Sequence, residues 1–315
     1  MHKKFSMFIN IVKFCAFHYF TSLLLTKASY IRYVFLWCVC LFAEYMRALR
    51  ASAVTLLDNE LFALPEPSAG NLNVYDAGDY MSHGTISIPV FSCNFVDMAA
   101  CCFYHCLYLA NAFTPNTCIV RLQMPSKLST WEVSDMNSET TVAVTSSHHL
   151  LVVCGTGSSK SLKLFSTDGV LHKTVKLQPD LVNLNSVAEL MPGHYVITRG
   201  RHSSDLHQVC VINSEGKVLH AYGGFQGSYQ TLMNTPVEAA IDKDGFVYVV
   251  EANGSRLIVL TKELDYVHCI NLHADYLKSR PRLKIDNETR RLYVRHVSED
   301  RWSTTYNVSV FEIEI

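Results

Sequence analysis

A short run of apolar and aromatic residues recurs along the chain at a nearly constant spacing. The runs occupy residues 61–64, 107–109, 151–153, 195–197, 247–249 and 292–294, and their starts lie 46, 44, 44, 52 and 45 residues apart. Gly, Asn, Asp, Ser and Pro separate the runs, and no long stretch has helical periodicity, so the pattern predicts β-strands. A repeat of about 45 residues with four short strands is typical of a β-propeller, whose blades bury their faces against one another.

The chain after residue 51 has room for six such units. It provides about 44 residues for each of six blades, and we therefore predict an all-β, six-bladed β-propeller over residues 51–315. In the clearest unit Asp244-Gly245 marks a tight turn between the first two strands. Asp168-Gly169 and Glu215-Gly216 predict the outer hairpins of two other blades, because glycine adopts positive φ without steric cost.

Closure of the ring requires a fourth strand in the last unit. This unit has only three evident strands, at residues 283–286, 291–296 and 307–315. An open ring would leave unpaired strand edges and uncovered blade faces. We therefore expect residues 47–53 to supply the outer strand of the last blade.

Residues 1–50 differ in composition from the repeats and form a separate part of the chain. They contain no acidic residue before Glu44, and residues 5–26 are mostly apolar, although Lys13 and His18 interrupt them. This predicts an apolar, helical extension that is a membrane anchor, a signal-like segment or an artefact of the gene model. A lysine inside a membrane span costs a few kcal/mol, which a span can tolerate. Membrane association through residues 5–26 is therefore one of three alternatives, beside a signal-like segment and an artefact of the gene model.

The fifth unit resembles a known repeat. Residues 236–249 (PVEAAIDKDGFVYV), continued by Asn253 and Arg256, look like an NHL repeat, and residues 222–228 resemble the glycine-rich loop before such repeats. The region from residue 51 is thus similar to the NHL propellers of tripartite-motif-like proteins, which implies an interaction module. The sequence departs from the family where residues 237–239 replace the His-Leu part of the signature, and it has no Cys/His array for a RING or B-box.

Charge and cysteine content exclude several classes of function. Charged residues make up 17% of the chain and the formal net charge is -1, so no overall field favours nucleic acid or membrane.

The eleven cysteines form no repeated pairs, which predicts thiols and a cytoplasmic propeller. Cys101, Cys102, Cys106 and Cys118 lack a second close pair for a tetrahedral site. We expect no metal and no small-molecule cofactor.

An enzyme with its site in the central channel is one alternative. Propellers similar to gluconolactonase bind a metal there through carboxylate and amide oxygens. Alignment of the inner strands brings six residues to equivalent positions near the channel mouth: Val54, Asp97, Thr141, Val187, Glu238 and Arg282. Asp97, Glu238 and Arg282 with two valines do not form the oxygen cage that a hard cation prefers. We therefore predict that the protein is not an enzyme. A metal-dependent, lactonase-like hydrolase is the second alternative.

The loops between second and third strands carry the residues that most resemble a recognition surface. Blades four to six would present a basic arc with one tryptophan: Arg199, Arg201, His202, Arg256, Arg295, His296, Arg301 and Trp302. Loops on one face of a rigid scaffold commonly bind partners. We expect a protein partner on this face, and RNA is the alternative, because single strands bind cationic loops with stacking aromatic residues.

Overall fold

The computed structural model describes most of the chain beyond residue 39. The described residues are 40–44, 53–65, 70–89, 94–112, 117–156, 159–181, 183–200, 206–225, 233–253, 256–272, 281–300 and 303–314. The apolar segment 5–26, with its expected helix, lies outside them. No helix among the described residues has the length and apolar character needed to cross a bilayer.

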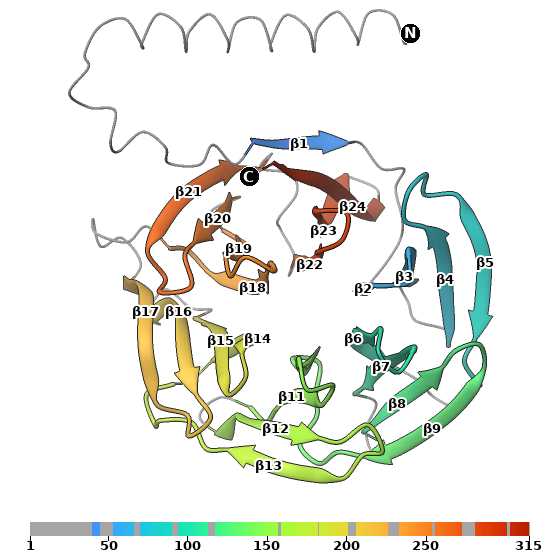
Figure 1. Ribbon diagram of the computed structural model, residues 1–315, viewed down its shortest axis with the longest axis horizontal. Helices are drawn as coiled ribbons and strands as arrows, with labels where there is room; N and C mark the ends of the chain where they lie inside the picture. The colour runs from blue at the N-terminus through green and yellow to red at the C-terminus, as the bar shows by residue number, and fades with distance from the viewer. Residues whose placement is uncertain are drawn as a thin grey trace, which may run out of the picture. The chain divides into compact units, whose positions relative to one another are not determined.

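The unit formed by residues 41–313 is a ring of six four-stranded antiparallel sheets around a central channel (Figure 1). This confirms the predicted six-bladed propeller. Each blade is named here by its strands from the channel outward. Blade 1 contains β2 (Ala53–Leu57), β3 (Glu60–Leu64), β4 (Asn71–Asp76) and β5 (Ser82–Ser87). Blade 2 contains β6 (Phe95–Cys101), β7 (Cys106–Asn111), β8 (Cys118–Gln123) and β9 (Lys127–Glu132).

The remaining blades repeat this order. Blade 3 contains β10 (Thr141–Val144), β11 (Leu150–Cys154), β12 (Ser161–Phe165) and β13 (Leu171–Val175). Blade 4 contains β14 (Leu184–Met191), β15 (His194–Arg199), β16 (Leu206–Asn213) and β17 (Val218–Phe225). Blade 5 contains β18 (Pro236–Ile241), β19 (Val247–Glu251), β20 (Arg256–Leu260) and β21 (Tyr266–Asn271). Blade 6 contains β22 (Arg282–Asp286), β23 (Arg291–Asp300), β24 (Ser303–Glu314) and β1 (Cys40–Glu44).

The core lies between neighbouring blades. Phe62 of blade 1 packs with Met98 and Leu107 of blade 2, and Tyr108 of blade 2 packs with Val152 of blade 3. Burying a large apolar side chain contributes about 1.5–3 kcal/mol relative to leaving it exposed. The recurring run identified in the sequence lies within the second strand of each blade, where neighbouring blades cover it.

The ring closes through a strand from upstream of the first blade, but not through residues 47–53. The outer strand of blade 6 is β1, which lies beside β24 (Figure 1). Ala53 instead begins β2, where it is paired with Leu64. β1 lies at the outer edge of blade 6 and β2 at the inner edge of blade 1. The inner and outer edges of a blade are about 14 Å apart at 4.7–4.9 Å per strand, so a segment that runs directly into β2 cannot also be the closing strand.

Polar side chains close the hairpin turns. Asp242 Oδ1 accepts the N–H groups of Asp244 and Phe246 at 3.0 and 2.8 Å. Asn213 Oδ1 does the same for Glu215 and Lys217 at 3.0 and 2.9 Å. Such local bonds favour turns over continued strands. They explain why the positions of the turns were readable from the sequence.

Gly216 allows two neighbouring blades to approach closely. It has φ +81° in the β16–β17 turn, and a Cβ atom there would overlap the carbonyl oxygen of Lys176, which follows β13. Gly193 has a similar φ, +77°, but a Cβ atom at Gly193 would lie 3.8 Å from its nearest neighbour, an atom of Ser214. An alanine at either position would have an unfavourable φ, but only an alanine at Gly216 would also overlap a neighbouring atom.

We expect Gly216→Ala to destabilise the propeller more than Gly193→Ala. Positive φ alone costs about 1 kcal/mol for an alanine, and the overlap with Lys176 should bring the loss at Gly216 to about 2–3 kcal/mol. Urea unfolding followed by circular dichroism measures both losses. Equal losses would contradict the close approach.

Candidate functional site in the central channel

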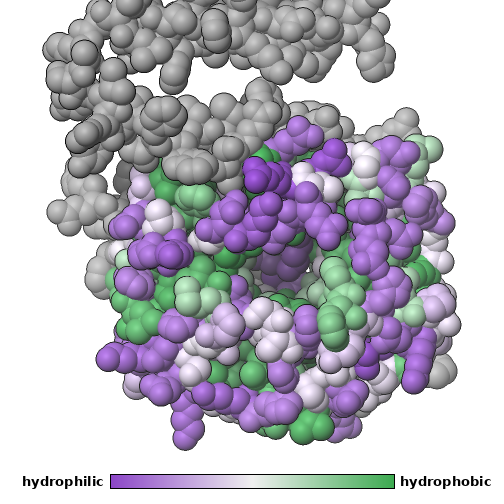
Figure 2. Space-filling model, in the orientation of Figure 1, coloured by the Kyte–Doolittle hydropathy of each residue, from purple (hydrophilic) through white to green (hydrophobic). Residues whose placement is uncertain are grey.

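The central channel contains a cavity of about 360 Å³. The innermost strand of every blade contributes to its wall, and Figure 2 shows the hollow in the middle of one face, with hydrophilic residues near its rim. Small side chains keep the cavity open: Ala99, Ala100, Ala143, Ala188, Ala239 and Ala240. A volume of this size is within the range of small-molecule sites.

The two ends of the cavity differ in exposure. Cys102 and Asn287 lie where inner strands turn into second strands, and both are exposed. Glu238 and Leu283 line the other end and are buried. The cavity therefore opens at the turn end of the inner strands.

Arg282 reaches across the channel at the buried end. It belongs to blade 6, yet its Nη2 donates to the carbonyl oxygen of Val96 in blade 2 at 3.3 Å. Its Nη1 lies 4.0 Å from both Asp97 Oδ2 of blade 2 and Glu238 Oε2 of blade 5. Burial alone would lower the pKa of Arg282, but the carboxylates of Asp97 and Glu238 raise it, so the guanidinium stays charged.

The structure thus brings Asp97, Glu238 and Arg282 together, as the alignment of inner strands predicts, but it buries them. Their exposed fractions are 1%, 4% and 6%. These three side chains therefore lie at the buried end of the cavity, where their opposite charges compensate one another, and not at the channel mouth. Asp97 and Glu238 also accept backbone N–H groups of the following blade, from Val142 at 2.9 Å and Leu283 at 2.8 Å. The cluster therefore joins blades to one another.

The inner-strand alignment is wrong by one residue in blade 4. Ser186, and not Val187, occupies the position of Asp97 and Glu238, because Ser186 Oγ accepts the N–H of Ala239 in the next blade at 3.2 Å. Bulges lie at the same place in blades 2, 4 and 5, directly before Asp97, Ser186 and Glu238, so these three residues share one register. The turn between the first two strands differs in length, with residues 102–105 in blade 2, 192–193 in blade 4 and 242–246 in blade 5, so the spacing of the repeats does not give the position on the inner strand.

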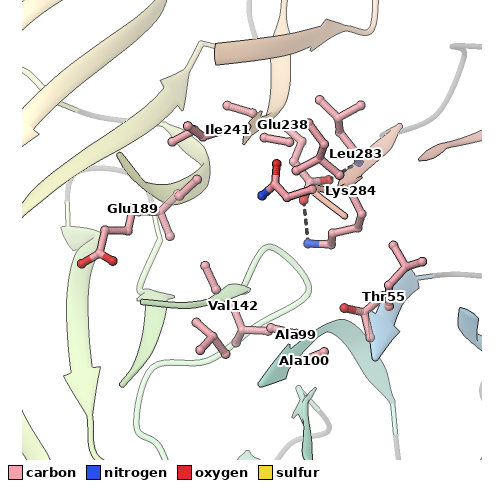
Figure 3. A pocket seen from close by; sticks show the side chains of 18 of the residues that line it. Thr55, Ala99, Ala100, Val142, Glu189, Glu238, Ile241, Leu283 and Lys284 are labelled. Carbon is pink, nitrogen blue, oxygen red and sulfur yellow. Dashed lines mark hydrogen bonds and ion pairs between the residues drawn. The ribbon is translucent and has the colours of Figure 1, made fainter. Parts of the chain in front are cut away.

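Lys284 is a candidate binding residue that the sequence analysis missed. Its side chain extends into the cavity beside Glu238, opposite Val142 and Ala99 (Figure 3). Nζ lies 3.1 Å from Glu238 Oε1, its only hydrogen-bond partner among the described residues. Alternation along β22 could have found Lys284, since it follows Arg282 by two residues and so lies on the same face.

The charge of Lys284 decides what it can do chemically. Burial would lower its pKa, but Glu238 and then Asp97 raise it, so the side chain remains an ammonium. An ammonium has three N–H donors and Glu238 takes one of them. Lys284 can therefore bind an acceptor oxygen, but it is not suited to act as a neutral amine nucleophile.

Three residues of the predicted basic arc are buried. Arg199, Arg295 and His296 are 4%, 6% and 3% exposed. Arg199 Nε donates to Gln208 Oε1 at 3.0 Å within blade 4. Arg295 and His296 lie inside β23, which continues to Asp300, and not in a loop. Burial, with Arg295 nearby, lowers the pKa of His296 to about 4, so this imidazole adds no positive charge near neutral pH.

The other members of the arc do not test the predicted binding of a partner on this surface. Arg256 is partly buried, and its Nη2 lies 2.7 Å from Oε2 of the fully buried Glu251. The remaining members lie outside the described residues: Arg201, His202, Arg301 and Trp302. Neither a protein nor an RNA partner is tested by this geometry.

Comparisons with known proteins support the fold and go no further. No family model matches the chain, and no curated protein matches it. A luciferin-regenerating enzyme has a TM-score of 0.62 at 11% identity, with 87% of this chain and 97% of that one covered. A PQQ-bound aldose sugar dehydrogenase from Streptomyces coelicolor has the same score and identity, covering 88% and 99%. Virginiamycin B lyase from Staphylococcus aureus has a TM-score of 0.56 at 8% identity, covering 88% and 100%.

These structures correct the prediction that the protein is not an enzyme. A lyase, a dehydrogenase and a luciferin-regenerating enzyme have this propeller fold, so the fold gives no ground for a non-catalytic assignment. At such low identity the likeness concerns architecture alone. The class defined here is a six-bladed propeller with a charged pocket in its channel.

Proposed function

We propose that the protein binds a small organic molecule in its central channel, with an acceptor oxygen of the ligand on Lys284. The observation that carries this proposal is an ammonium with unassigned N–H donors inside a cavity that opens to solvent. Ligand sites commonly combine an apolar wall with a few polar groups that fix orientation. Here the alanines, with Val142 and Val187, supply the wall, and Lys284 and Glu238 supply the polar groups.

The chemistry favours a carboxylate or a carbonyl group on the ligand. A charged donor makes shorter and stronger hydrogen bonds to such oxygens than a neutral donor does. The same ammonium would stabilise negative charge that develops on a carbonyl oxygen during a reaction. Lys284 would therefore contact an acceptor oxygen both in an enzyme that binds a substrate and in a protein that only binds a ligand.

A divalent metal does not fit the carboxylates of this channel. Arg282 lies between Asp97 and Glu238 and supplies the positive charge that a cation would otherwise bring. Both oxygens of Glu238 are already engaged, by the N–H of Leu283 and by Lys284. Hard cations need several free oxygen ligands. The metal-dependent lactonase alternative is therefore the weaker one.

We also propose that the blades are NHL-type repeats, a finer assignment than the shared propeller fold. Blade 5 supports it, because the residues that resemble the repeat form β18 and β19 around the Asp242 turn. Tyr248 Oη donates to Asp242 Oδ2 at 3.0 Å and ties the second strand to this turn. The proposal concerns the repeat and assigns no partner.

Replacement of Lys284 tests the channel site. A panel of small carboxylic acids and lactones is screened by thermal shift, and the best ligand is titrated by calorimetry. A ligand at 100 times its Kd adds about 2.7 kcal/mol of stability. We expect Lys284→Met to weaken binding at least tenfold, because an acceptor oxygen loses its charged donor.

Two further variants complete the experiment. Lys262→Met is the control, because the Lys262 side chain is 57% exposed and its ion pair among the described residues is with its neighbour Glu263 at 3.8 Å. Ala188→Phe should block binding by filling the cavity. A ligand that binds Lys284→Met and Ala188→Phe as tightly as the unchanged protein would place the site outside the channel.

A further inference from the structure

Cys101 and Cys106 face each other across the first hairpin of blade 2. They are register partners of β6 and β7, and the turn between them consists of residues 102–105. Directly opposed residues of antiparallel strands have Cα atoms about 4.5–5.5 Å apart. Disulfides join Cα atoms about 4.4–6.8 Å apart, so the backbone needs little movement to link this pair. Both cysteines are free thiols in the structure.

Donor groups surround Cys106. Tyr108 Oη and Arg121 Nε are buried and have no hydrogen-bond partner of good geometry among the described residues. Tyr108 and Arg121 are themselves register partners, on β7 and β8, and both side chains contact Cys106. Leaving a buried donor unsatisfied costs about 1–3 kcal/mol. A thiolate at Cys106 would supply the acceptor that these donors lack.

The protonation of the two sulfurs follows from these contacts. Contact with the Cys101 thiol, followed by the contacts with Arg121 and Tyr108, outweighs burial and lowers the pKa of Cys106 to about 6. The same contact raises the pKa of Cys101, which stays a thiol. One thiolate beside one thiol is the arrangement of a reactive cysteine with a resolving partner.

We propose that Cys106 and Cys101 are a peroxide-sensitive pair that forms an intramolecular disulfide. The Cys106 thiolate attacks hydrogen peroxide, so that an S–O bond forms, the O–O bond breaks and the leaving hydroxide is protonated to water. Cys101 then attacks the sulfenic sulfur of Cys106. The S–S bond forms, the S–O bond breaks, and the hydroxyl leaves as water with the proton of Cys101. The two thiols lose two electrons, and one peroxide becomes two waters.

The position of the pair allows a small oxidant to approach. Cys101 and Cys106 are 2% and 0% exposed, but all four residues of the turn above them are exposed, and Phe103 is 68% exposed. Opening of a short exposed turn requires far less free energy than global unfolding. Cys102 in this turn lines the channel cavity, so the disulfide would brace one side of the pocket entrance.

Peptide mapping tests the proposal on the full chain with Cys102→Ser, which removes the adjacent exposed thiol. The protein is treated with a few equivalents of hydrogen peroxide, the remaining thiols are alkylated under denaturing conditions, and chymotrypsin is added without reductant. Cleavage after Phe103 and Tyr104 separates the peptides that contain Cys101 and Cys106. We expect these two peptides to stay linked and to separate when dithiothreitol is added.

Variants resolve the two steps. With Cys101→Ser, Cys106 should stop at the sulfenic acid, which a cyclic 1,3-diketone labels. Arg121→Met should slow peroxide oxidation of Cys106 about tenfold at neutral pH, because the thiolate fraction falls. Tyr108→Phe, which keeps the ring, should slow it in the same direction and serves if Arg121→Met does not fold.

Buried cysteines elsewhere supply the internal control. Burial raises the pKa of Cys154 to about 12 and that of Cys210 to about 11, so neither should react at the same dose. Modification of Cys154 and Cys210 before Cys106 would overturn the proposal. A disulfide from Cys106 to a cysteine other than Cys101 would overturn it as well.

Discussion

Arg282→Met should lower the free energy of unfolding by about 3–5 kcal/mol, which is the usual cost of leaving a buried charge without its partner. Asp97 is 1% exposed and its Oδ2 lies 4.0 Å from Arg282 Nη1, so Arg282 compensates the charge of this buried carboxylate. For a domain of this size the loss corresponds to a melting temperature about 6–20 °C lower. Calorimetry and urea unfolding both measure the change.

Two further variants show whether the charge is responsible. Asp97→Asn combined with Arg282→Met should recover part of the loss, because the uncompensated carboxylate is gone. Lys262→Met removes a lysine whose exposed pair with Glu263 contributes little, and it should change stability by less than about 0.5 kcal/mol. A loss below about 1 kcal/mol for Arg282→Met would show that the inner strands are held together without this cluster.

Removal of β1 should have the second largest effect. A chain that starts at residue 45 lacks the outer strand of blade 6, which leaves β24 as an unpaired edge. Each lost backbone hydrogen bond costs about 1 kcal/mol, and the loss of a few of them should lower the melting temperature by about 5–10 °C. The exposed edge should also make the shortened protein aggregate.

The matched control is a chain that starts at residue 40 and keeps β1. It should melt at the temperature of the full chain, and light scattering should show a single soluble species. Equal melting temperatures for the chains that start at 40 and at 45 would show that β1 does not contribute to ring closure.

Features that depend on local residues were predictable. The recurring second strand appears in the sequence because its apolar side chains, such as Leu107 and Val249, are buried between blades wherever the repeat occurs. Turn positions were readable for a similar reason, since Gly169 and Gly216 adopt positive φ within a few residues of the strands they connect. The number of blades follows from this spacing and the chain length.

The candidate site was predictable only in part. Repeat alignment identified Asp97, Glu238 and Arg282 as neighbours, but it could not show that Arg282 turns across the channel to blade 2 and buries all three. Nor could it show that Arg295 and His296 lie inside a strand, because the length of the β23–β24 hairpin depends on pairing with β24 rather than on the repeat.

The sequence by itself therefore determined the architecture: an all-β chain of six repeats, because strand periodicity and turn chemistry act over a few residues. The tertiary structure alone decided which charges are buried, which residue of β14 aligns with Glu238, and that β1 closes the ring beside β24. The position of Ser186 is defined by a contact between blades, and ring closure joins segments some 270 residues apart. Local sequence contains no signal for either, because the energy that selects them arises only when the ring is assembled.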